Sequence, residues 1–195
     1  MLKRLYFLLL LCGAWLFFVA PAQAAGQKFM LDDGHSYVLW RINHLGFSPQ
    51  VGKWYAKGFI VMDKSDPTQD KVEATIDMAA LVTGLPALDE HLKSKVFLDV
   101  ARYPTATFVS NKVDATGKTS LTVHGMLTLH GVSKPVVLLV KLNKEGKNPF
   151  SNKMSVGFTA TAMIKRSDFD MNTMLPDLGD EVTLDIGAEA YQATP

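Results

Sequence analysis

Two polar side chains that end apolar strand faces are the first candidates for chemistry. With the two-residue period of a β-strand, the stretch Ser36–Gly46 places Val38, Trp40, Ile42 and His44 on one face. A second such face runs from residue 154 to Ile164 and continues through Arg166 and Asp168. Histidine titrates near neutrality, and a buried arginine requires a partner, a role that Asp168 would fill. The pattern predicts either an ion pair or hydrogen-bond cluster that closes one end of the strands, or a contact between His44 or Arg166 and the polar head of a ligand.

The other histidines do not have the spacing of a metal site. His124 and His130 share a strand face but lie six residues apart, about 20 Å along an extended chain, too far for one ion. His91 follows Asp89 and Glu90 in a cluster that is typical of a solvated helical face or a capping network. We therefore expect no bound metal.

Signatures of catalysis are absent from the sequence. It contains no G-x-S-x-G, no H-E-x-x-H and no phosphate-binding glycine loop, and its one cysteine, Cys12, lies in the N-terminal apolar run. The sequence therefore favours a protein without enzymatic activity. The alternative of an enzyme with His44 or a nearby carboxylate as acid or base remains open.

The N-terminus has the pattern of a secretory signal peptide over residues 1–24. Lys3 and Arg4 precede an apolar run, and Ala22-Gln23-Ala24 forms a small-x-small cleavage site. An uncleaved membrane anchor is the alternative. Cleavage would leave a periplasmic chain that begins at Ala25, has no cysteine and depends on its core for stability.

The remaining 171 residues, 25–195, are enough for a single domain. Without Lys3 and Arg4, 18 basic residues face 19 acidic ones, and no basic block occurs. This balance argues against nucleic acid as a partner.

Eight segments alternate apolar and polar residues as half-buried strands do. They are Ser36–Gly46, Gly52–Asp63, Lys71–Met78, Thr105–Val113, Ser120–Gly131, Pro135–Asn143, Lys153–Phe169 and Glu181–Gln192. Between the third and fourth, apolar residues recur every three or four positions, which predicts one or two short helices with Thr83 as a candidate cap and Pro86 at an early position.

Eight antiparallel strands with one apolar face each form either a sandwich or a closed barrel. A barrel of this size is just filled by its side chains or holds one small ligand. Many residues of the apolar faces are small: Ala56, Gly58, Ala74, Gly125, Ala160, Ala162, Ala188 and Ala190. Small inward residues favour a cavity, although they also permit tight curvature.

Several motifs together resemble the YceI family. They are D-x-H-S from Asp33, V-x-W-x-I-x-H-L-G from Val38, V-G-K-W from Val51, D-E-H-L-K-S from Asp89, V-F-L-D from Val96, Y-P-x-A-x-F from Tyr103, H-G-x-L-T-L-H-G-V from His124, R-S-D-F from Arg166 and G-D-E-V from Gly179. They span almost the whole chain after residue 24 in the family's order. Asp170 departs from the family, which usually has glycine at that position.

The resemblance implies an eight-stranded antiparallel lipocalin-like β-barrel whose interior binds a polyisoprenoid, an isoprenoid quinone or a similar lipid, with no other cofactor. The candidate lumen and mouth residues are Val38, Trp40, Ile42, His44, Trp54, Ile76, Phe108, Phe158, Ala160, Ala162, Ile164, Arg166 and Asp168.

We therefore expect a periplasmic carrier of a long apolar lipid that makes transient membrane contact. An enzyme acting on such a lipid and a module that docks a membrane redox partner are the alternatives. The oligomeric state stays open, a dimer included.

Overall fold

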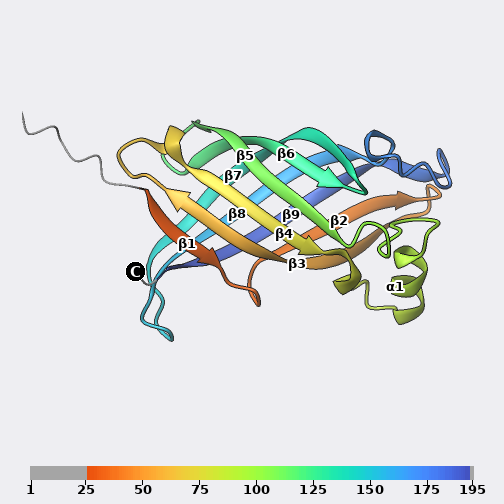
Figure 1. Cartoon of the computed structure of the whole chain (residues 1–195), viewed down its shortest axis with the longest axis horizontal. Helices are drawn as coiled ribbons and strands as arrows, with labels where there is room; N and C mark the ends of the chain where they lie inside the picture. The colour runs from red at the N-terminus through yellow and green to blue at the C-terminus, as the bar shows by residue number, and fades with distance from the viewer. Residues whose placement is uncertain (1–25, 194–195) are drawn as a thin grey trace, which may run out of the picture.

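The computed structural model describes residues 26–193. The predicted signal peptide, residues 1–24, lies outside the described residues. One sheet contains all nine strands: β1 (Gln27–Leu31), β2 (Tyr37–His44), β3 (Ser48–Met62), β4 (Lys71–Asp77), β5 (Thr105–Ala115), β6 (Ser120–Leu129), β7 (Val132–Lys147), β8 (Met154–Lys165) and β9 (Leu178–Gln192). One short helix, α1 (Pro86–Lys93), lies in the connection between β4 and β5 (Figure 1).

The sheet closes into a barrel because the order β3-β2-β9-β8-β7-β6-β5-β4 returns to β3 through the β3–β4 pairing. β1 pairs with β3 and β9, the same two neighbours that β2 has. β1 and β2 thus share one of eight places in the ring, separated by a turn over residues 32–36. The eight-stranded antiparallel barrel predicted from the sequence is confirmed, and β1 is a short segment that the predicted strands did not include.

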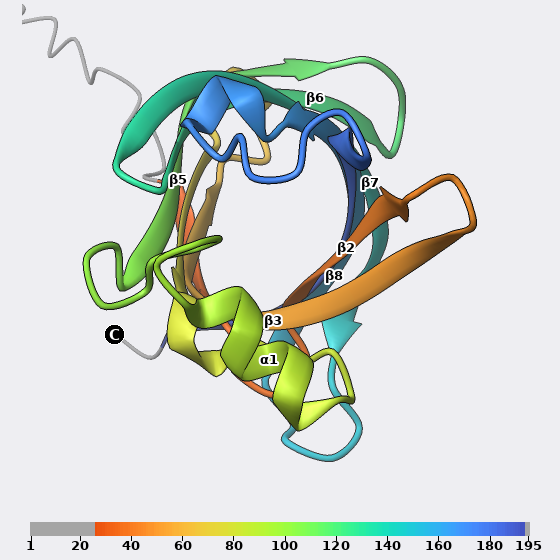
Figure 2. The same ribbon diagram turned by 90° about the vertical axis from the view of Figure 1, so that its right-hand side faces the viewer.

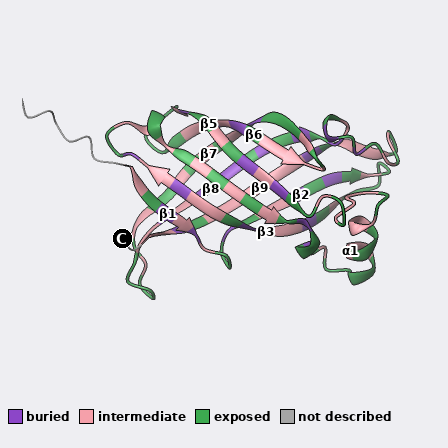
Figure 3. Ribbon diagram, viewed as in Figure 1, coloured by how far each residue is buried: buried purple, intermediate pink, exposed green. Residues whose placement is uncertain are grey.

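Alternation of apolar and polar residues gives each strand one face toward the interior. In β8, buried residues alternate with exposed ones from Phe158 to Lys165, and Figure 3 shows buried stretches among intermediate and exposed ones on the strands of the barrel. Gly58, at φ +146°, is required where β3 bends past β4, because a Cβ there would stand 2.0 Å from the Glu73 carbonyl oxygen.

The two ends of the barrel differ. The loops β2–β3, β4–β5 with α1, β6–β7 and β8–β9 gather at one end, toward which Figure 2 looks. Toward the other end, where β1 begins, buried side chains fill the interior: Phe29, Leu31, Ala56, Ile60, Val156, Phe158 and Ala190. We call these the α1 end and the packed end.

Several predicted element boundaries are wrong, among them the start of β3, predicted at Gly52 and found at Ser48, and both ends of β7, predicted over Pro135–Asn143 and found over Val132–Lys147. The strand expected over Lys153–Phe169 ends at Lys165, and Ser167–Phe169 forms a 3-10 turn. The predicted cap Thr83 lies two residues before the actual N-cap, Leu85, whereas Pro86 does occupy the first helical position.

Candidate functional site

A cavity of about 530 Å³ occupies the α1 end of the barrel. Its wall consists of residues along the whole of β2, from the ends of β4, β6 and β8, from the first halves of β3, β5 and β9, and from the helix α1 and the loops around it and between β8 and β9. Such a volume lies within the range of about 300–1,000 Å³ that small-molecule sites occupy. The interior is therefore hollow at one end and filled at the other.

Eight of the thirteen predicted site residues line this cavity: Val38, Trp40, Ile42, His44, Trp54, Ile76, Ile164 and Arg166. The two polar residues that end apolar strand faces, His44 and Arg166, are both in its wall. The structure thus brings together the residues that the alternation on β2 and β8 placed at one end of the barrel.

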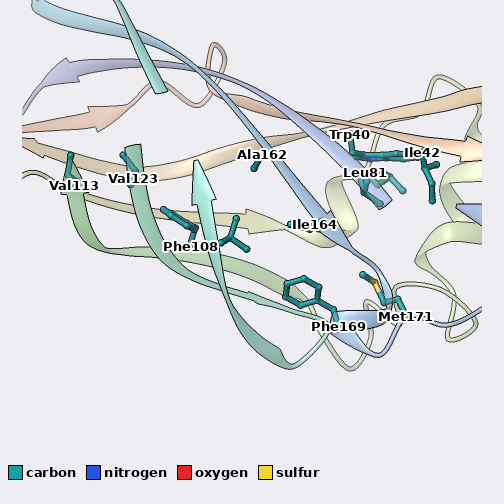
Figure 4. Close-up of a cluster of buried hydrophobic side chains, with 12 residues drawn as sticks. Trp40, Ile42, Leu81, Phe108, Val113, Val123, Ala162, Ile164, Phe169 and Met171 are labelled. Carbon is teal, nitrogen blue, oxygen red and sulfur yellow. The ribbon is translucent and has the colours of Figure 1, made fainter. Parts of the chain in front are cut away.

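The other five candidates do not line it. Phe108 and Ala162 lie in a buried cluster beside the cavity, Phe158 belongs to the packed end, and Ala160 is buried. Asp168 is exposed and lies beside a separate surface hollow. Figure 4 shows how the side chains of the cluster beside the cavity converge, with Trp40 and Ile42 on one side and Phe169 and Met171 on another.

The small residues predicted to open the cavity do not line it. Ala56 and Ala190 belong to the packed end, and a Cβ on Gly125 would stand 2.4 Å from the Phe108 ring. The glycine therefore makes room for an aromatic ring rather than for a ligand. Ala106 is the only alanine or glycine in the cavity wall.

Residues after β4 and β8 complete the wall, and the sequence prediction missed them. They are Met78, Leu88, His91, Leu92, Phe97 and Leu98 from the α1 segment, and Met171, Thr173 and Met174 from the β8–β9 loop. The spacing of Leu88 and Leu92 in the predicted helix was the available signal, because an apolar stripe on a short helix needs a surface to cover. The loop residues have no comparable pattern.

Among residues 26–193, Arg166 carries the one permanent charge in the wall, and no aspartate or glutamate lines the cavity. The side chain is buried and donates from Nε to the Gly179 carbonyl, from Nη1 and Nη2 to that of Thr173, and from Nη2 to that of Leu178, at 2.9–3.2 Å. Burial lowers the pKa of the guanidinium, and the Asp180 carboxylate opposes that shift. Arg166 therefore holds the β8–β9 loop over the end of the barrel.

Of the two closures predicted for this end of the barrel, the ion pair between Arg166 and Asp168 is wrong, and a hydrogen-bond cluster around Arg166 is present. The pairing requires an extended strand through residue 168, but the backbone of Arg166 is already helical and begins the 3-10 turn. Asp180 instead accepts hydrogen bonds from the backbone N–H and hydroxyl of Ser167, at 2.8 and 2.7 Å, which lower the pKa of its carboxyl.

The remaining polar wall residues are few. Trp54 donates from Nε1 to the Met78 carbonyl at 3.2 Å, and its ring lies 6.1 Å from that of Trp40. His91 makes an edge contact with Phe97, at 4.9 Å between ring centroids. Polar capacity in this wall is therefore concentrated in the indole N–H of Trp40, which has no hydrogen-bond partner among the described residues, and in His44, Gln50, His91, Arg166 and Thr173.

The histidines do not assemble into a metal site. His35 pairs with Asp32 at 3.0 Å, His124 with Asp114 at 3.2 Å, and His130 with the carbonyl of Phe169 at 3.1 Å. Within residues 26–193, no group of three His, Cys, Asp or Glu side chains is arranged to hold a metal ion, and no helix is long and apolar enough to cross a membrane.

Known proteins are similar to this chain in sequence, and others in structure. The protein YceI of Salmonella arizonae is 39% identical over 178 residues, which cover 91% of this chain and 92% of that protein. The crystal structure of BcnA from Burkholderia cenocepacia superposes with a TM-score of 0.72 at 25% identity, over 84% of this chain and 99% of BcnA.

A more distant likeness, in the fold alone, is to a polyisoprenoid binding domain from Saccharophagus degradans. Its TM-score is 0.62 at 14% identity, and the match covers 86% of this chain and 99% of that domain. The model of the YceI-like domain matches residues 29–190. The chain therefore belongs to the YceI family.

Proposed function

We propose that the protein is a periplasmic carrier of a long apolar lipid of the isoprenoid class, which it binds reversibly and without chemical change. The observation that carries this proposal is the apolar cavity of about 530 Å³ at one end of a closed barrel. Burying apolar surface in it would stabilise a complex by about 25 cal/mol per Å², less the cost of ordering the ligand. The polyisoprenoid binding domain of Saccharophagus degradans, which has the same fold, supports the ligand class.

The size of the cavity sets how much of a ligand it holds. At about 30 Å³ per non-hydrogen atom, the share of liquid volume that one water molecule occupies, it seats roughly 18 atoms, or between three and four isoprene units. The packed end prevents a longer chain from passing through the barrel. A longer lipid would keep part of its length at the mouth.

The polar groups in the wall suit the head of such a lipid. His44, Gln50 and Thr173 supply hydrogen-bonding groups, and Arg166 supplies positive charge without a carboxylate in the cavity wall. These groups favour a neutral or anionic head over a cationic one. Because no carboxylate of the described residues lines the wall, neither His44 nor His91 has an acidic partner there. This supports reversible binding over acid–base catalysis.

The decisive experiment is mass spectrometry of an organic extract of the protein, purified without detergent from the periplasm of its own host. An unrelated periplasmic protein treated in the same way is the control. We expect an isoprenoid lipid in stoichiometric amount. An extract that contains no lipid, even after the protein has been incubated with membranes, would contradict the carrier proposal. So would chemical conversion of the lipid by wild type, if a His44→Ala variant stays folded but no longer converts it.

Chain length gives a second measurement. We expect the affinity for isoprenoid alcohols to rise steeply up to about 20 carbons and then to level off, because only the part inside the cavity adds buried area. Quenching of Trp40 and Trp54, which line the cavity, measures this series. Affinity that continues to rise with length at the same slope would show that the packed end opens.

A further inference from the structure

Large apolar side chains are exposed on the loops around the cavity. They are Leu45 and Phe47 in the β2–β3 turn, Leu85 and Val96 on either side of α1, and Met174 in the β8–β9 loop, and we call them the apolar rim. Phe47 is the most exposed of them, at 88%. Exposed apolar residues that cluster on one surface mark interaction sites, whereas scattered ones do not.

The turn that carries Phe47 is held in place rather than loose. Gly46 donates its N–H to the Asn43 side chain at 2.7 Å, and Phe47 donates to the His44 carbonyl at 3.0 Å. Leu45 donates to the carbonyl of Asp177, which ties the turn to the β8–β9 loop at 3.1 Å. The backbone therefore holds the phenyl ring outward even though water around it is unfavourable.

The apolar rim continues into the cavity wall. Leu45 follows His44 in the sequence, and Val96 precedes Phe97; His44 and Phe97 both line the cavity. Met174 lines the cavity itself and is half exposed as well. The apolar rim and the cavity wall therefore adjoin along three segments of the chain.

The packed end of the barrel is different. Its loops, residues 63–70, 116–119 and 148–153, are rich in polar residues, and in them Phe150 is the only large apolar side chain that is exposed. Phe150 is 97% exposed, which makes it a natural control for Phe47. The apolar rim is thus a property of the α1 end and not of barrel loops in general.

We propose that the α1 end docks on the surface of a lipid bilayer, with Phe47 and its neighbours in the apolar rim inserted among the lipids and the cavity mouth facing the membrane. This inference rests on the proposed function, because a carrier of an apolar lipid must receive it from a membrane.

The contact between the rim and the membrane is apolar rather than ionic. Residues 85–104 carry three acidic and three basic side chains, and the β2–β3 turn, residues 45–47, carries none. Residues 166–177 add one basic side chain, that of Arg166, and three acidic ones.

The test is co-flotation of the protein with vesicles of phosphatidylcholine, which carry no net charge. Wild type, Phe47→Ser and Phe150→Ser are compared, and mass spectrometry establishes that all three have the same N-terminus, so that any effect of residues 1–24 cancels. We expect wild type and Phe150→Ser to bind alike and Phe47→Ser to bind about tenfold more weakly, because it loses the burial of a phenyl ring. Binding should change little between 50 and 500 mM salt, since an apolar contact is not screened.

Uptake of lipid separates this inference from the proposed function. When a short isoprenoid alcohol is supplied in solution, Phe47→Ser should bind the alcohol as wild type does. When the same alcohol is supplied in vesicles, Phe47→Ser should take it up more slowly than wild type. Equal flotation of Phe47→Ser and wild type would overturn the docking proposal. A second outcome would also overturn it: wild type does not float but dimerises, and Phe47→Ser does not dimerise. The apolar rim would then bind a second copy of the chain and not a membrane. Normal docking with no lipid uptake would leave docking intact and contradict the carrier function.

Discussion

Arg166 illustrates what a buried charge does when no carboxylate contacts it. Removing a guanidinium from water costs several kcal/mol, and hydrogen bonds must offset that cost. The backbone carbonyls of Thr173 in the β8–β9 loop and of Leu178 and Gly179 at the start of β9 receive those bonds, and the loop is thereby held across the barrel. The residue has a structural role at the mouth whether or not a ligand head reaches it.

Asp70 shows the opposite situation, a carboxylate whose burial is only partly compensated. Its Oδ1 accepts a hydrogen bond from the Asp63 N–H at 2.7 Å, yet desolvation raises its pKa to about 6, and the carboxylates of Asp63 and Asp66 add to the rise. The folded protein therefore binds this proton more tightly than the unfolded chain, whose aspartate has a pKa near 3.8. The stability that this difference gives is fully present below pH 3.8 and is lost as the pH rises through about 6.

Asp70→Asn should accordingly stabilise the protein at pH 7.5. The amide oxygen retains the bond from Asp63, and the buried charge disappears. A shift of two units would correspond to about 3 kcal/mol, which half exposure reduces to about 1 kcal/mol, or 2–4 °C in Tm. Thermal unfolding at pH 4 and pH 7.5 measures the effect, which should be present only at the higher pH.

Asp66→Asn is the matched control for that prediction. Bonds from the hydroxyl and N–H of Thr68 lower the pKa of the Asp66 carboxyl, so its ionised form contributes stability that is present at neutral pH and lost on acidification. We expect this variant to be no more stable than wild type at pH 7.5. An equal gain in both variants would mean that general relief of negative charge, not burial of Asp70, is responsible.

At the scale of elements, α1 is the least firmly held part of the cavity wall. It has eight residues, none of them buried, and a helix of that length is not stable by itself. Its main ties are the Asp89 carboxylate, which accepts from the hydroxyl and N–H of Thr83 at 2.6 and 2.8 Å, and the Thr173 hydroxyl, which donates to the Val96 carbonyl at 2.5 Å. We infer that α1 is the part of the wall that opens first.

Asp89→Ala should loosen α1 without unfolding the barrel. Loss of the bonds from Thr83 removes about 0.5–2 kcal/mol of local stability, so amide exchange over residues 83–94 and release of bound lipid should both become several-fold faster. Glu90→Ala is the control, because Glu90 is exposed and contacts only Lys93 on the same helix. Equal acceleration in both variants, or a large fall in Tm, would show that Asp89 does not act locally on α1.

The sequence predicts elements better than it predicts the cavity wall. Alternation on β2 and β8 identifies their inward residues because the period of a strand fixes which face a residue takes. The same period fails at Asp168, since nothing in the alternation marks the end of β8 at Lys165. Met171, Thr173 and Met174 enter the wall because Arg166 binds their loop, a tertiary arrangement that no local period encodes.

For the whole molecule, the central property is that one end of a continuous barrel is hollow and the other is packed. Both ends are lined by alternating apolar residues, and none of the small residues predicted to create space lines the hollow end. The cavity results instead from the loops, which hold α1 and residues 166–177 over the mouth and close a volume that the strands leave unfilled. Alanine is found in both environments, with Ala106 in the cavity wall at 3% exposure and Ala56 in the packed end at 6%.

Leucine substitution at these two alanines should therefore have opposite effects. In Ala106→Leu the added carbons enter the cavity, so the variant should be as stable as wild type or about 1 kcal/mol more stable, and it should bind a 20-carbon isoprenoid about tenfold more weakly. In Ala56→Leu the same carbons meet a filled interior, which costs about 1–3 kcal/mol, and lipid affinity should change little because Ala56 does not reach the cavity. Denaturant unfolding and quenching of Trp40 and Trp54 measure both quantities on the same samples. Equal destabilisation by the two substitutions would mean that the α1 end collapses in solution when it is empty, and the volume that the proposed ligand needs would then arise only on binding.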